Sequence, residues 1–376
     1  MQPPTAPPRD GITQQQVVSL IQDSPALTVG RGIELVDLSL SVLDDLTLDF
    51  AGGRVERHSY NTLHGQAELS FSRPLDWGSA IVRPYMTLSD GTDTARFNLG
   101  AYYTSTPETQ LGEEPPTWTA TGYDILLILG DLVGESYAVA AGQPYLAAVE
   151  AILVDRGVQA YVIDQAAADR VLPSARTWAL DDNATWLTIV NDLLGAVGYA
   201  GVWSDWDGRL RCGPYQNPRD RAPEWLYTVD DATSMLTSRR TLADDYFDAP
   251  NRWVAVRSNN VDGAAPVEGN GLWTYQNDVD GPTSVQARGR VITAPLLQLD
   301  VADQAALVAA ARQQIDADRR RRTTVTVGTS PNPLHWHFDR LAVADPAMGS
   351  ALLDVMCTSW VLPLDGADMS HDWSTI

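Results

Sequence analysis

The spacing of apolar and polar residues changes several times along the chain. Alternation predicts β-strands in "LSLSVLDDLTLDF" (38–50) and "GQAELSFSR" (65–73). A turn at Ser89-Asp90-Gly91 separates two further predicted strands, and "TWTATGYDILLIL" (117–129) follows after a polar loop. Short strands separated by Gly, Asp and Pro favour a barrel or a sandwich.

Between Ile125 and Pro214 the apolar residues instead recur at helical spacing. One helix is predicted in "QPYLAAVEAILVDRG" (143–157), and a second in "DDNATWLTIVNDLLGAVG" (181–198), with Asp182 or Asn183 as its N-cap. A hairpin turning at Asp207-Gly208 follows. These elements predict a small α+β module.

Strand patterns return after Tyr227, in "MLTSRRTL" (235–242), "NRWVAVRSN" (251–259) and "TSVQARGRVITAP" (283–295). One helix interrupts them, expected over 300–318 with Asp300 as its cap. The run Arg319–Arg322 suits the negative end of the helix dipole. Contact with an acidic partner or with nucleic acid is the alternative explanation of that run.

We therefore predict a β-rich α+β chain with two barrel-like β domains and a small α+β module between them. Its length of 376 residues allows about two or three domains. There is a faint internal similarity between "RPYMTLSDG" with "WTATGYDILLIL" and "DRLAVADPAMG" with "LLDVMCTSWVLPL". Either a duplicated barrel or chance would explain this similarity. The expected boundaries are an N-terminal arm (1–35), a first β domain (36–124), the module (125–226) and a second β domain (227–376).

The chain is strongly acidic, with 48 Asp and Glu against 26 Lys and Arg and a net charge of −22. This balance disfavours a surface that follows the phosphates of a nucleic acid. No apolar run is long enough to span a bilayer, and "MQPPTAPPRDG" has no feature of a secretory signal. Cys212 and Cys357 could form one disulfide, but two thiols are the stronger expectation.

Sequence motifs for catalysis are absent from the chain. It has no nucleophile elbow, P-loop, dinucleotide fingerprint, zinc-protease motif or C-x-x-C pair. Asp205 and Asp207 begin like a calcium loop, but the remaining ligands are missing and a hairpin turn explains them better. We therefore assign no catalytic residue and no cofactor.

One tract could hold a metal ion. In "NPLHWHFDRLAVADP" (332–346), a strand would place His335, His337 and Asp339 on one face. In the alternative interpretation, Leu334, Trp336 and Phe338 pack inward and the His side faces solvent or a partner. We favour the alternative, because the other ligands of a metal site are not evident, and we assign no metal site.

The order of several segments resembles hub proteins at the tail tip or baseplate of tailed bacteriophages. The segments are "FNLGAYYTSTPE" with "TWTATGYDILLIL", then "ATWLTIVNDLLGAVGYAGVWSDWDGRLRCGPY", "DDYFDAPNRWVAVRSN", and the stretch from Asp300 through 332–346. The resemblance covers roughly 36–376, and it rests on the ordered series rather than on one specific motif.

This resemblance implies a structural, non-enzymatic virion protein of a long-tailed phage. Such hubs are homotrimers in which two barrel-like domains per chain adapt a six-fold tail tube to a three-fold tip. The expected partners are the distal tail protein ring, the tape measure protein and a tip or central fibre protein. DNA would pass through an acidic lumen without specific binding, and no membrane insertion is expected. The alternatives are a hydrolase of cell-wall or surface glycans, or a carbohydrate-binding tail module.

Overall fold

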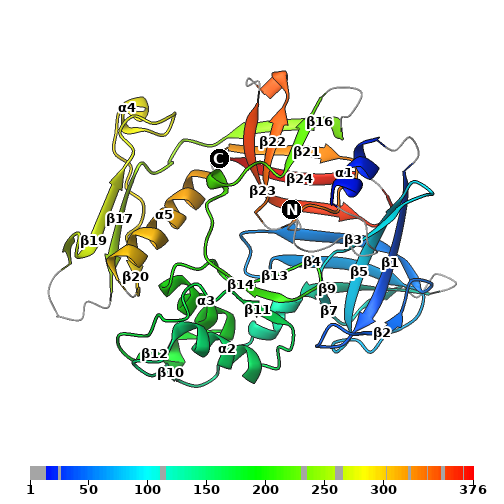
Figure 1. Ribbon diagram of the computed structural model, residues 1–376, viewed down its shortest axis with the longest axis horizontal. Helices are drawn as coiled ribbons and strands as arrows, with labels where there is room; N and C mark the ends of the chain where they lie inside the picture. The colour runs from blue at the N-terminus through cyan, green and yellow to red at the C-terminus, as the bar shows by residue number, and fades with distance from the viewer. Residues whose placement is uncertain are drawn as a thin grey trace.

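The computed structural model describes residues 14–23, 27–110, 116–229, 235–258, 266–301, 303–320, 323–336, 338–348, 352–366 and 368–376. Strands form most of its regular structure, so the expected β-rich class is confirmed (Figure 1). Within these residues no helix is both long and apolar enough to cross a membrane.

One long, mixed sheet runs through most of the molecule. From end to end its main path is β16 (Leu236–Asp244), β21 (Thr323–Thr329), β24 (Met369–Thr375), β23 (Leu353–Pro363), β3 (Phe50–His58), β4 (Gly65–Phe71), β9 (Thr117–Asp124), β7 (Tyr102–Thr104), β5 (Ile81–Ser89), β1 (Thr28–Val36) and β2 (Val42–Asp45). β6 (Thr94–Asn98), β8 (Glu108–Gln110), β15 (Trp225–Thr228) and β22 (Arg340–Ala344) join it beside this path.

The two expected barrel-like domains are not confirmed, since no closed barrel is found among the described strands. The reason is the pairing of β23 with β3, in which Trp360 is opposite Arg57 and Val361 is opposite Glu56. This pairing joins the N-terminal and C-terminal β regions edge to edge, so neither region closes on itself. The domain boundaries drawn from the sequence remain a prediction.

A common hydrophobic core lies under both β regions. It contains Val55 and Leu69 from the first region and Val325, Trp360 and Trp373 from the second. The helix α1 (Gln14–Asp23) adds Val17 and Leu20 to this core. The two regions therefore share buried apolar surface as well as backbone hydrogen bonds.

The helices and short strands expected between Ile125 and Pro214 are present, around a second core to which Val36, Ile81 and Ala101 of the first β region also contribute. The elements of this module are η1 (Ile125–Leu129), β10 (Tyr137–Val139), α2 (Tyr145–Asp155), β11 (Tyr161–Ile163), β12 (Arg176–Trp178), η2 (Leu180–Asp182), α3 (Trp186–Ala196), β13 (Trp203–Ser204), β14 (Leu210–Cys212) and η3 (Pro218–Asp220). The N-cap of α3 is Thr185, whose hydroxyl accepts the Thr188 N–H, and not Asp182 or Asn183. The hairpin at Asp207-Gly208 is confirmed.

A peripheral lobe extends from the C-terminal β region, on the left in Figure 1. It consists of β17 (Arg252–Arg257), β18 (Val267–Glu268), β19 (Gly271–Gln276), α4 (Val285–Arg288), β20 (Leu297–Leu299) and α5 (Gln304–Arg320), and η4 (Pro346–Met348) lies outside it, after β22. Two predictions were wrong here. Residues 285–288 are helical, because Ser284 caps them and Gly289 ends them. The long helix begins at Gln304, since Asp303 and not Asp300 accepts the Ala306 N–H.

Candidate functional site: a polar face on a continuous wall

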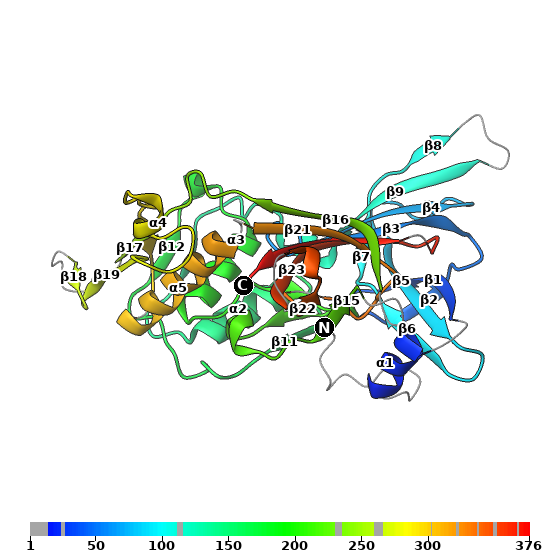
Figure 2. The same cartoon turned by 90° about the horizontal axis from the view of Figure 1, so that it is seen from above.

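Eight described strands of the long sheet form a continuous antiparallel surface, which we call the wall. In order they are β16, β21, β24, β23, β3, β4, β9 and β8. β7 pairs with the C-terminal end of β9 and β8 with its N-terminal end, so β8 is the outer strand at that end. Figure 2 shows β8 and β9 projecting beyond the rest of the sheet.

Side chains alternate between the two faces of the wall, as in any strand. One face covers the common core through Val55, Leu69, Val325 and Trp373. The opposite face, which we call the polar face, is not buried in the described structure. It carries Thr324, Thr326, Ser370, Asp372, Ser359, Arg54, Glu56, His58, Gln66, Glu68, Ser70, Thr119 and Thr121, together with Val361, Pro363 and Tyr123.

Cross-strand hydrogen bonds hold the polar face in place. Asp372 accepts from the Thr326 hydroxyl at 2.7 Å and from the Ser359 hydroxyl at 2.9 Å. Ser70 and Thr119 share a hydroxyl hydrogen bond at 2.8 Å. These short side chains satisfy one another and present hydroxyl and carboxylate oxygens on this face.

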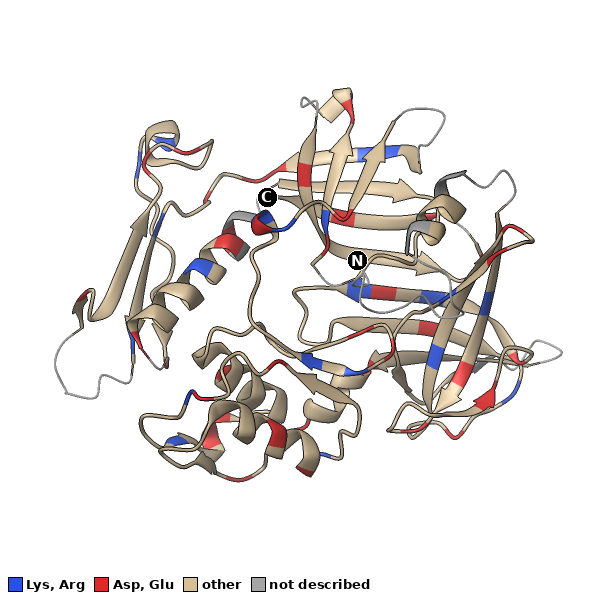
Figure 3. Ribbon diagram, in the orientation of Figure 1, with Lys and Arg blue, Asp and Glu red and all other residues tan. Residues whose placement is uncertain are grey.

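The charges on the polar face are few, and carboxylates outnumber arginines among them. Arg54 pairs with Glu56 at 2.6 Å and with Glu68 at 3.1 Å, so its guanidinium is flanked by two carboxylates. Asp372 adds a third carboxylate. Figure 3 shows charged residues on β3 beside strands that carry few of them. The face is therefore weakly acidic and offers no cluster of arginines to phosphate groups.

A buried polar junction lies behind β3. The Arg57 Nη1 and the Asp124 Oδ2 are 3.4 Å apart, and the Ser204 hydroxyl donates to the same carboxylate oxygen at 2.7 Å. The Arg57 guanidinium lies 4.2 Å from the centroid of the Trp336 ring, and the Trp336 indole N–H donates to the Ser204 carbonyl at 3.0 Å. This junction ties both β regions to the module.

Sequence reasoning missed the junction because its members come from four distant segments. Arg57 is in β3, Asp124 ends β9, Ser204 is in β13, and Trp336 follows β21. Only one sequence feature could have indicated a buried ion pair. Arg57 and Asp124 both occupy strand positions that alternation predicts to face the core.

The His335 tract differs from its prediction. It is a loop between β21 and β22 rather than a strand, and His335 and Asp339 are both buried. The expectation that this side faces solvent or a partner was therefore wrong for His335 and Asp339, while Trp336 is buried as expected. His337 lies outside the described residues.

The loop turns inward because His335 and Asp339 have partners there. The Nδ1 of His335 lies 3.3 Å from the Asp339 carboxylate, its Nε2 contacts the Tyr227 hydroxyl, and Asp339 also accepts the Trp336 backbone N–H at 2.9 Å. Among the described residues, no group of three His, Cys, Asp or Glu side chains is placed to hold a metal ion.

A second histidine lies against the first inside the core. The rings of His335 and His371 are 5.3 Å apart, and the His371 Nε2 shares a hydrogen bond with the Thr329 hydroxyl at 2.8 Å. Burial lowers the pKa of His371 to about 3, and burial together with the field of His371 lowers the pKa of His335 well below its usual value. Both rings are therefore neutral at physiological pH.

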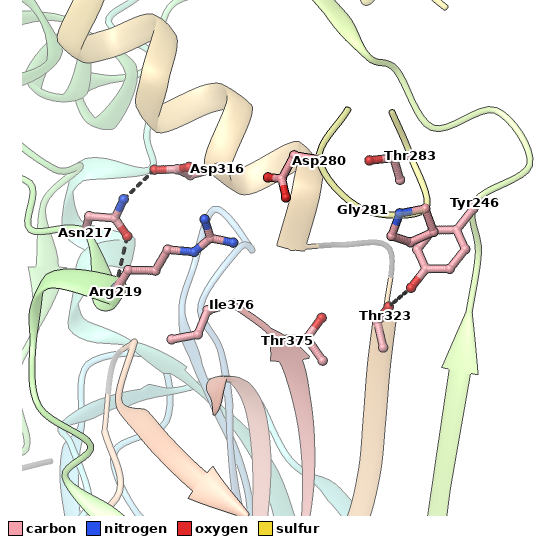
Figure 4. A pocket seen from close by; sticks show the side chains of 11 residues that line it. Asn217, Arg219, Tyr246, Asp280, Gly281, Thr283, Asp316, Thr323, Thr375 and Ile376 are labelled. Atoms are coloured by element: carbon pink, nitrogen blue, oxygen red, sulfur yellow. Dashed lines mark hydrogen bonds between the residues drawn. The ribbon is translucent and has the colours of Figure 1, made fainter. Parts of the chain in front are cut away.

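A cleft of about 210 Å³ separates the peripheral lobe from the end of the wall (Figure 4). Its lining residues are Asn217, Arg219, Tyr246, Asp280, Gly281, Pro282, Thr283, Asp316, Thr323, Thr375 and Ile376. Asn217 donates to Asp316 at 2.8 Å, and Tyr246 is 2.6 Å from the Thr323 hydroxyl. None of these lining residues is a His or a Cys, so the cleft lacks a paired nucleophile and imidazole base.

The two cysteines are free thiols in separate cores. Cys212 lies in the module core and Cys357 in the common core, and both are buried. Burial raises the pKa of each thiol to about 12, so both are protonated and unreactive. The expectation of two thiols is confirmed.

No family model and no curated protein matches the sequence. Solved structures do match it. A tail protein from Neisseria meningitidis MC58 is 14% identical, with a TM-score of 0.64 over 92% of this chain and 96% of that one. The 43 kDa tail protein of prophage MuSo2 from Shewanella oneidensis is 11% identical, with a TM-score of 0.62 over 92% and 98%.

The chain has the fold of phage tail proteins. A third match, the prophage tail protein gp18 from Listeria monocytogenes EGD-e, is 12% identical, with a TM-score of 0.51 over 91% of this chain and 94% of that one. These matches extend over nearly the whole of each chain. The matched part of this chain therefore includes most of both β regions, the module and the lobe.

Proposed function

We propose that this protein is a structural component of a bacteriophage tail tip, a homotrimeric hub that surrounds the channel for the tape measure and DNA. The observation that carries the proposal is the wall: a continuous sheet with one face on a shared core and the other face polar and uncovered. The tail-protein fold supports a role in a phage tail. In the proposed hub the polar face of each copy faces the channel.

The chemistry of the polar face suits a passage rather than a binding site. Arg54 in β3, on this face, is already paired with Glu56 and Glu68. A DNA phosphate would therefore meet carboxylates and hydroxyls, and it would gain no counterion release from binding. The acidic lumen expected from the net charge becomes, in this proposal, a hydroxyl-rich lumen of weak negative charge.

The two β regions also suit the proposed change of symmetry. Each copy would contribute two β regions joined at β23 and β3, so three copies would present six similar units to a six-fold tube. In this proposal the neighbours are the distal tail protein ring on one side and a tip or fibre protein on the other. The chain acts in the virion, without enzymatic activity.

The test of the proposal is the mass of the purified chain by native mass spectrometry, combined with electron microscopy of the particle. We expect a trimer with a central channel lined by β3, β4, β21 and β24. A lumen variant sharpens the test, because Thr326→Arg together with Gln66→Arg would add two positive charges to the polar face, opposite Asp372 and Glu56. That variant should gain salt-sensitive DNA binding. A ring whose lumen is formed by other elements would refute the proposal.

A further inference from the structure

The chain enters and leaves the peripheral lobe at neighbouring points of the wall. β16 ends at Asp244 before the lobe begins, and β21 starts at Thr323, just after the last helix of the lobe. These two residues are opposite each other in the sheet, and the Thr323 hydroxyl donates to the Asp244 carboxylate at 2.6 Å. We call this pair the hinge, because both connections to the lobe pass through it at the ends of regular elements.

The helix α5 extends from the hinge to the module. It has 17 residues, which makes it about 25 Å long. Its C-terminal end lies beside the hinge, and its N-terminal end lies by the module (Figure 1). The cleft of about 210 Å³ lies beside the hinge, where Asn217 of the module donates to Asp316 of α5 at 2.8 Å. A small rotation at the hinge would therefore move the far end of α5 by a larger distance.

Two ion pairs hold the far end of α5 against the module, and we call them the latch. The Arg170 Nη1 is 2.7 Å from the Asp303 Oδ2, with side-chain exposures of 52% and 45%. The Arg176 Nε is 3.1 Å from the Asp300 Oδ2. Among the described residues, the buried apolar clusters of the lobe are separate from the core of the module. Because exposed ion pairs contribute little to stability, the latch is a weak contact.

Opening the latch would leave no buried charge without a partner. Arg176 also pairs with Asp192, which belongs to the module, at 3.3 Å. Arg170 and Asp303 are already about half exposed, so water can replace the partner that each loses. The start of α5 does not depend on the latch, because the Ala306 N–H donates to the other carboxylate oxygen of Asp303. The lobe can therefore separate from the module while it stays folded.

We propose that the peripheral lobe is a movable arm, in which α5 turns about the hinge and the latch holds its far end against the module. The inference goes beyond the proposed hub and does not depend on it. The structure shows the latched position. Since the latch consists of exposed charges, salt screens it, and the lobe leaves the module as a folded unit when the ionic strength rises.

Distance measurements between two spin labels test this proposal. Leu296→Cys in the lobe and Val154→Cys in α2 of the module carry the labels, since both positions are exposed. The native Cys212 and Cys357 are buried and add little labelling. Labelled chains are diluted with unlabelled ones, so that only distances within one copy are measured. The reference pair is Val154→Cys with Leu43→Cys on β2, which reports the module against the wall without the lobe.

The latch variant is Arg170→Gln combined with Asp303→Asn. It keeps the net charge, and it keeps an N-cap for α5 because asparagine caps helices as well as aspartate does. The matched control is Arg73→Gln with Asp49→Asn, an exposed ion pair at 2.6 Å within the first β region. We expect a second lobe-to-module distance whose population in the latch variant is roughly two- to fivefold that in the unsubstituted chain. The control variant should match the unsubstituted chain.

Salt provides a second measurement on the chain without a latch substitution. Raising sodium chloride from about 0.05 M to about 0.5 M should increase the population of the second distance and leave the reference pair unchanged. One narrow lobe-to-module distance in every variant and at every salt concentration would overturn the movable arm. An equal rise in the control variant would show that the latch is not the contact responsible, and a change in the reference pair would show that the module moves instead of the lobe.

Discussion

Arg57 and Asp124 form an ion pair inside the protein, with 3.4 Å between Nη1 and Oδ2 and side-chain exposures of 4% and 1%. Arg57 belongs to the strand that joins the two β regions, and Asp124 ends the strand that leads into the module. The pair therefore links the two β regions and the module. Removing one partner would leave the other charge buried.

The first prediction concerns this pair. Asp124→Ala should lower the free energy of unfolding by about 3–5 kcal/mol, because the buried charge of Arg57 would lose its carboxylate partner. The control is Glu68→Ala, which breaks an exposed pair with Arg54 and should cost less than about 1 kcal/mol. Denaturant unfolding monitored by tryptophan fluorescence measures both. Equal losses in the two variants would show that burial of the pair is unimportant.

The second prediction separates His335 from a solvent-facing histidine. His335→Gln should destabilise the fold by about 1–3 kcal/mol, since Asp339 and the Tyr227 hydroxyl each lose a buried partner. His58→Gln is the matched control on the polar face, where the side chain is 39% exposed, and should change stability little. Thermal unfolding of both variants is the measurement, and a neutral His335→Gln would contradict the buried network.

The third prediction is a loss of stability on mild acidification. The folded pKa of His371 is about 3 and the unfolded value is near 6.5, so below pH 6.5 the unfolded chain takes up a proton that the folded chain refuses. Stability is therefore full above pH 6.5 and falls as the pH drops toward 3, by up to about 1.4 kcal/mol per pH unit for this group.

His335 and His64 have lowered pKa values for the same main reason, burial, and act in the same direction. The measurement is the free energy of unfolding between pH 7 and pH 5, above the range in which most carboxylates titrate. His371→Gln should give a shallower pH profile than the wild type. Parallel profiles for the two proteins would contradict a neutral, buried His371.

The fourth prediction concerns the independence of the peripheral lobe. Its buried apolar residues form clusters separate from the common core, and Trp253 is 1% exposed with its indole N–H on Asp318 at 3.0 Å. Trp253→Ala should destabilise the lobe by about 3–5 kcal/mol. Hydrogen exchange should then rise in β17, β19 and α5 and stay unchanged in β3 and β23. A rise throughout the wall would show that lobe and wall unfold together.

Local patterns determined much of the element content. Alternation and helical spacing predicted the hairpin at Asp207-Gly208, the helices α2 and α3, and the strands around 235–242 and 251–257, because each depends on neighbouring residues. The prediction failed where a local pattern fitted two residues or two kinds of element equally well. The cap of the long helix is Asp303 rather than Asp300, and residues 285–288 form a helical turn rather than a strand.

Local sequence patterns were enough to predict a β-rich chain with a module and one long helix, and the order of its segments already indicated a phage tail protein. That the two β regions share one sheet could not be predicted in this way, because the pairing of Trp360 with Arg57 joins strands far apart in sequence. The burial of His335 was likewise not predictable from alternation, which would place this side chain in solvent. A buried neutral imidazole needs hydrogen-bond partners. The loop turns inward because His335 finds them in Asp339, four residues on, and in Tyr227, which is distant in sequence.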